Sequence, residues 1–147
     1  MNLRNFLIFG LFLSIQINIS FSACHNYRQI SRQADYVSRD LENLYQEVRY
    51  YFPYEYNLQQ FTRKAQVDAE FLYRLNQDGS MPCYQTKENY YNLQKSSDLL
   101  RNYFSNFSRR RNIRYLEMEW RRFIDDYKYL EIIMQNAREN KENNNDI

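Results

Sequence analysis

The chain has 147 residues, of which only two are glycine and two are proline, while 44% are hydrophobic and 26% are charged. This balance is typical of one soluble globular domain. So few turn-forming residues exclude the many tight turns of a β-sandwich, a barrel or a doubly wound sheet, and they exclude a glycine-rich phosphate loop. Aromatic residues make up 18% of the chain, enough for a substantial core. We therefore expect an all-α protein built from long helices.

Residues 1–23 have the pattern of a cleaved signal peptide. Arg4 precedes an apolar stretch from Phe6 to Ile19, and small residues at the end of the segment, up to Ala23, suit a signal peptidase. A stretch of roughly 14 residues falls short of the about 20 that a membrane-spanning helix needs, which argues against a membrane anchor. After cleavage the chain would hold 19 basic and 18 acidic residues, a net charge of +1. We expect a secreted or periplasmic protein.

Four apolar stripes with the 3-4 spacing of amphipathic helices follow the signal peptide. The first stripe stops at Phe52 and Pro53, because proline cannot continue a helix. The second ends before Gly79, which suits the left-handed conformation of a helix stop, and Thr86 is the expected N-cap of the third. The stripes run from Tyr27 to Tyr51, from Leu58 to Leu75, from Tyr90 to Phe107 and from Ile113 to Ala137.

Four stripes of similar length with short connections predict an antiparallel up-down-up-down four-helix bundle. We expect this domain to span residues 24–139 and a disordered polar tail to follow at residues 140–147. The register of the stripes places one large side chain against small ones, as dense core packing favours. The expected layer consists of Leu41, Ala65, Ser97 and Trp120.

The usual cofactors of helical bundles lack ligands in this sequence. The only histidine is His25, whereas a di-iron bundle needs a Glu-x-x-His motif on each of two helices, and c-type haem needs Cys-x-x-Cys-His. The carboxylate pairs are one or two residues apart, so their members point in different directions on a helix and should face solvent. We predict no catalytic, cofactor-binding or metal-binding residues and no enzymatic activity. The pairs are Asp68 with Glu70, Glu117 with Glu119, and Asp125 with Asp126.

Cys24 and Cys83 are the two cysteines, and both precede helices that run in the same direction in an antiparallel bundle. They should therefore lie at the same end, where an oxidising compartment would join them in a disulfide. Two alternatives stay open. A bacterial signal peptidase could leave Cys24 as a lipid-carrying N-terminus, which would anchor the protein to a membrane, or both thiols could be free.

Tyrosine and arginine residues cluster at the first and third helix connections, which share the end opposite the cysteines. We call this surface, residues 50–56 and 109–115, the Tyr/Arg end. Both residue types are enriched in binding surfaces, although arginines at a helix C-terminus also complement its dipole. The net charge near zero argues against nucleic acid as a partner. The candidate partner-binding residues are Tyr50, Tyr54, Tyr56, Arg109, Arg110, Arg111 and Tyr115.

The sequence thus predicts an exported, non-catalytic protein that binds a protein or a component of the cell envelope through the Tyr/Arg end. The alternative is a carrier whose helical core, rich in tyrosine and phenylalanine, opens to hold a small apolar ligand.

Overall fold

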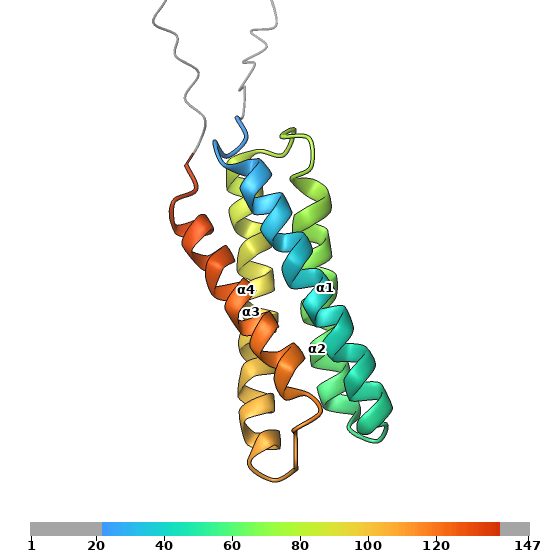
Figure 1. Cartoon of the computed structure of the whole chain (residues 1–147). Coiled ribbons are helices and arrows are strands. Elements are labelled where there is room, and N and C mark those ends of the chain that lie inside the picture. The colour runs from blue at the N-terminus through green and yellow to red at the C-terminus, as the bar shows by residue number, and fades with distance from the viewer. Residues whose placement is uncertain (1–21, 139–147) are drawn as a thin grey trace, which may run out of the picture.

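A computed structural model describes residues 22–138 as four long helices packed side by side (Figure 1). The chain runs down α1, up α2, down α3 and up α4, so the expected up-down-up-down bundle is confirmed. The predicted signal peptide and polar tail lie outside the described residues, except for Ser22 and Ala23. The helices are α1 (Tyr27–Tyr51), α2 (Tyr56–Leu75), α3 (Cys83–Ser108) and α4 (Glu117–Gln135).

The α1 and α2 helices each pack closely against two neighbours. The α1 helix lies against α2 on one side and α4 on the other, and α2 lies against α1 and α3. The predicted stripe of α1 is buried from Ile30 through Leu41 to Val48, whereas Tyr27 at its start is only partly buried and Tyr51 at its end is 40% exposed. The backbones of α3 and α4 approach each other less closely than those of the other neighbouring pairs. Aromatic side chains fill this wider α3–α4 side: Phe104 stacks on Trp120, which adjoins Phe123, which adjoins Tyr127.

Two expectations about local structure were wrong. Trp120 stacks on Phe104, with ring centroids 3.8 Å apart, and it is only partly buried, so it does not form the expected layer with Ser97. Thr86 is not the N-cap of α3, because the helix begins three residues earlier, directly after Pro82. The buried Thr86 hydroxyl instead donates a 2.7 Å hydrogen bond to the side-chain oxygen of Asn76, at the end of α2.

The connections between helices follow the proline and glycine signals. The α1 helix ends at Tyr51, directly before Phe52 and Pro53, and the side-chain amide of Gln59 donates to the carbonyls of both turn residues. In the α2–α3 loop, Gly79 has a φ of +73°, which L side chains rarely adopt. Within residues 22–138, no helix is long and apolar enough to span a membrane.

Replacing Gly79 with alanine should destabilise the domain by about 1–2 kcal/mol, because a side chain is strained at positive φ. The new Cβ would also come within 2.7 Å of the Tyr27 ring. Urea denaturation followed by circular dichroism measures this loss, with Gln77→Ala in the same loop as the matched control. Equal midpoints for the two variants would contradict the prediction.

Candidate functional site

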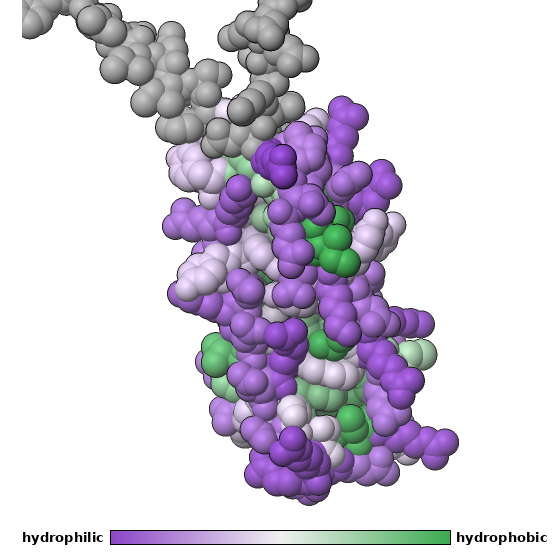
Figure 2. Space-filling model, turned by 90° about the vertical axis from the view of Figure 1, so that its left-hand side faces the viewer, coloured by the Kyte–Doolittle hydropathy of each residue, from purple (hydrophilic) through white to green (hydrophobic). Residues whose placement is uncertain are grey.

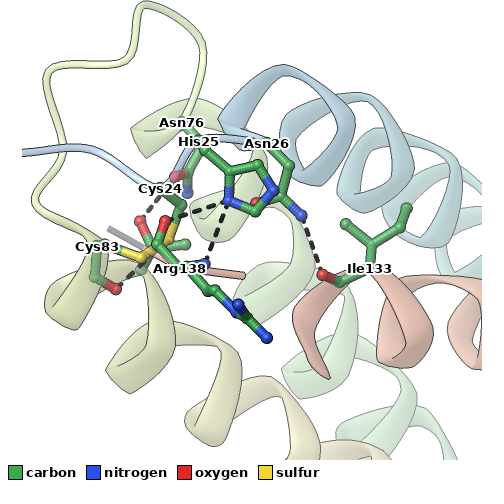
Figure 3. The surroundings of a disulfide bond; sticks show 8 residues. Cys24, His25, Asn26, Asn76, Cys83, Ile133 and Arg138 are labelled. Carbon is green, nitrogen blue, oxygen red and sulfur yellow. Dashed lines mark hydrogen bonds between the residues drawn. A yellow bond between two sulfur atoms is a disulfide. The ribbon is translucent and has the colours of Figure 1, made fainter. Parts of the chain in front are cut away.

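A buried disulfide between Cys24 and Cys83 closes one end of the bundle (Figure 3). The Cα atoms are 4.5 Å apart, and at most 1% of either residue is exposed. The backbone N–H of Cys83 donates to the carbonyl of Ser22, so the segment before α1 is also hydrogen-bonded to the start of α3. The expected disulfide is confirmed, and it links α1 to α3 through the loop that crosses the end of the bundle.

The same segment is attached to the end of α4. The side-chain amide of Asn26 donates to the carbonyl of Ile133 at 3.0 Å, and the backbone N–H of His25 donates to the carbonyl of Arg138 at 2.9 Å (Figure 3). The imidazole of His25 lies against the same residue, where its Nδ1 is 3.4 Å from the Arg138 N–H. This histidine therefore has a structural position at the end of the bundle.

The lipid alternative for Cys24 was wrong, because a sulfur that is bonded to Cys83 cannot also carry a lipid thioether. The free-thiol alternative fails for the same reason. Disulfides persist mainly outside the reducing cytoplasm, so this bond points to a non-cytoplasmic location.

Replacing both cysteines with serine should lower the free energy of unfolding by about 2–4 kcal/mol. The disulfide closes a loop of 59 residues and so lowers the conformational entropy of the unfolded chain. This reduction in entropy is the main source of the expected stabilisation. Urea denaturation of the oxidised protein, the reduced protein and the Cys24→Ser, Cys83→Ser variant measures the loss. The reduced protein and the variant should agree, and a variant as stable as the oxidised protein would refute the prediction.

At the opposite end, the structure brings the two predicted turns together. Tyr51 stacks on Tyr115 with ring centroids 4.4 Å apart and planes at 10°, and Phe52 packs edge-on against Phe107 at 5.0 Å. Tyr51 and Phe52 belong to the predicted Tyr/Arg end, but the sequence did not predict which rings pair across the two turns. The pairing depends on how the two turns are placed relative to each other, and this placement is known only from the folded structure.

The candidate tyrosines at this end are well exposed. Tyr54 is 84% exposed and Tyr50 is 78% exposed, while Tyr56 and Tyr115 are exposed to 70% and 60%. Large aromatic side chains are more often buried, and tyrosine is enriched where proteins bind one another. Tyr50 also packs edge-on against Tyr51, so it adjoins the stacked pair that joins the turns.

The three candidate arginines are exposed and extend the C-terminus of α3. The backbone N–H groups of Arg110 and Arg111 both donate to the carbonyl of Phe107, and Arg109 follows the last helical residue directly. The Arg111 side chain lies 3.8 Å from the Glu55 carboxylate in the other turn, so a weak ion pair also joins the two turns. The arginines thus complement the helix dipole and remain accessible to a partner.

A shallow depression lies beside the Tyr/Arg end on the wider α3–α4 side. It has a volume of about 320 Å³ and an apolar lining from Phe104, Ile113 and Trp120. Its polar lining residues include Ser108, Glu117 and Arg121. The face of the molecule in Figure 2 is mainly hydrophilic, with separate apolar patches instead of one continuous apolar surface. Sequence analysis missed this depression because it depends on the spacing of α3 and α4.

A second missed feature is a cluster of carboxylates between α1 and α4. Glu119 is only 8% exposed, and its Oε2 and the Oδ2 of Asp40 are buried without a hydrogen-bond partner. The side-chain amide of Gln33 donates to a carboxylate oxygen of Asp126 at 3.0 Å. The expectation that Glu119 and Asp126 face solvent was therefore wrong. Residues 33 and 40 are two turns apart on α1, as are 119 and 126 on α4, so each pair shares one face.

The pKa of Asp40 is raised from 3.8 to about 7, mainly because the carboxyl is buried and also because the carboxylates of Asp126 and Glu119 lie nearby, against a lowering effect of Arg122. At neutral pH the Asp40 carboxyl is therefore partly protonated. Within residues 22–138, no group of three or more histidine, cysteine, aspartate or glutamate side chains is arranged to hold a metal ion.

The Asp40 carboxyl should make folding stability depend on pH. Because its pKa is higher in the folded state, it contributes full stability below about pH 4, and this contribution is lost as the pH rises through about 7. Asp40 is partly exposed, so we expect a loss of about 2 kcal/mol by pH 8 instead of the full value of the shift.

The Asp40→Asn variant should match the wild type in stability below about pH 4 and exceed it at pH 8. Urea denaturation across this range measures the difference, and Asp125→Asn, at an exposed neighbouring position, is the control. A constant difference between Asp40→Asn and the wild type at all pH values would contradict the assignment.

Comparisons of the chain with protein-family models, curated proteins and solved structures found no match. Its function is therefore argued from the two ends of the bundle alone.

Proposed function

We propose that this domain is an exported, non-catalytic interaction protein that binds a protein or an envelope component through the Tyr/Arg end. The observation that supports the proposal is the set of four highly exposed tyrosines beside exposed arginines, on two turns that aromatic stacking joins into one surface. Tyrosine and arginine dominate the binding energy of many interfaces because each combines a large contact area with polar groups. An ordered surface also loses little conformational freedom on binding.

The disulfide supports export, since paired cysteines persist in oxidising compartments. The signal-peptide pattern of residues 1–23 points in the same direction. The difference between the two ends also supports the proposal. One end is closed by a buried disulfide, whereas the other has exposed aromatic and charged side chains. The alternative of an apolar-ligand carrier stays a prediction.

A photoreactive phenylalanine derivative placed at Tyr54 should crosslink to a discrete partner in the extracellular or envelope fraction of the source cells. The same derivative at Tyr129, an exposed tyrosine on α4 outside the Tyr/Arg end, is the control. Gel electrophoresis and mass spectrometry of the products measure the result. We expect a product at Tyr54 and none of the same mass at Tyr129.

Replacing Arg109, Arg110 and Arg111 with serine should reduce the Tyr54 product at least about tenfold, because charged hydrogen bonds at an interface are among its stronger contacts. The matched variant replaces three exposed basic residues near the disulfide end, Arg28, Arg32 and Lys87, and should leave the yield unchanged. Equal yields from both triple variants, with helicity preserved in both, would refute the proposal.

A further inference from the structure

The Tyr/Arg end has an excess of positive charge that the domain as a whole lacks. Four arginines lie in residues 109–116, whereas the nearby carboxylates are Glu55 in the opposing turn and Glu117 at the start of α4, which is paired with Arg121. Among the residues that the structure describes, no carboxylate lies within ion-pair distance of Arg109, Arg110 or Arg114; only Arg111 has one, at 3.8 Å. Because the remainder of the mature chain is close to neutral, this charge is a local property of one surface and favours an anionic partner.

The depression beside these arginines indicates that the partner also contributes an apolar group. The stacked rings of Phe104 and Trp120 and the side chain of Ile113 line it, and its volume of about 320 Å³ is at the lower end of the range for small-ligand sites. Ser108, which immediately precedes the arginine run, also lines it, so the depression and the charge are contiguous. A space of this size suits one apolar side chain, and an anchor residue in a pocket is the usual centre of a protein interface.

We infer that the Tyr/Arg end binds an acidic segment of a partner protein, one apolar side chain of which enters the depression between α3 and α4. This inference rests on the proposed function and specifies its partner. A polyanion such as a sulfated polysaccharide would use the arginines but not the depression. An anionic membrane would need a continuous apolar face, whereas the apolar patches on the face seen in Figure 2 are separate and surrounded by hydrophilic surface.

The test uses the oxidised mature protein and nine-residue peptides that carry four glutamates on each side of a central residue. The central residue is leucine, phenylalanine or alanine, and a fourth peptide has leucine between lysines. Fluorescence anisotropy of labelled peptides measures affinity. Titration with unlabelled peptides measures the change in Trp120 fluorescence emission. Trp120 is the only tryptophan in the chain, and it lines the depression. Heparin and phosphatidylserine vesicles are the alternative ligands.

We expect the acidic leucine and phenylalanine peptides to bind at least about tenfold more tightly than the alanine peptide and to change the Trp120 emission. The lysine peptide should not bind. Equal affinity of the leucine and alanine peptides with unchanged emission would overturn the inference in favour of a general polyanion surface. Tighter binding of heparin or vesicles than of any peptide, or no binding of any acidic peptide at low salt, would also overturn it.

Two variants separate the charge from the depression. Replacing Ser105, an exposed residue at the depression, with glutamine should remove the preference for leucine over alanine, whereas Asn92→Gln at an exposed position elsewhere on α3 should not. Replacing Arg109, Arg110 and Arg111 with serine should lower the affinity for every acidic peptide at least about tenfold. If no acidic peptide binds while the yield of the Tyr54 crosslink still depends on these arginines, the proposed function is supported and only this inference is wrong.

Discussion

The apolar stripe of α1 is the interaction on which the rest of the bundle depends. It is buried from Ile30 to Val48, over about five turns, and it packs closely against both α2 and α4. Short connections then require alternate loops to lie at opposite ends of the bundle. The two ends of the bundle therefore differ: one contains the disulfide between Cys24 and Cys83, and the other is the Tyr/Arg end.

Features that follow from local pattern and connectivity were predictable from the sequence. The four stripes have a helical period, Pro53 and Gly79 mark two of the connections, and the antiparallel order places both cysteines at one end. The same reasoning placed Tyr54 and Arg110 at a common end. In each case the prediction needed only the direction of a helix and not its rotation or its distance from a neighbour.

Features that depend on helix rotation and spacing were not predictable. Trp120 stacks on Phe104 across the wider α3–α4 side, and the register of α1 against α4 buries Glu119 beside a partly buried Asp40. Carboxylates beside an apolar stripe resemble the solvated face of any amphipathic helix until the neighbouring helix is in place. The Gln33 contact with Asp126 has a structural consequence, because a one-turn slip between α1 and α4 would leave that buried amide and carboxylate unpaired.

The first and last described residues meet at the same end of the bundle, where the backbone of His25 is hydrogen-bonded to that of Arg138. Any surface or further chain attached through either terminus would therefore hold the domain by its disulfide end. The 25 residues of α1 extend about 38 Å at 1.5 Å per residue, so the exposed tyrosines would project roughly that far from the point of attachment. The bundle would then act as a rigid spacer that keeps its tyrosine-bearing tip clear of the attachment surface.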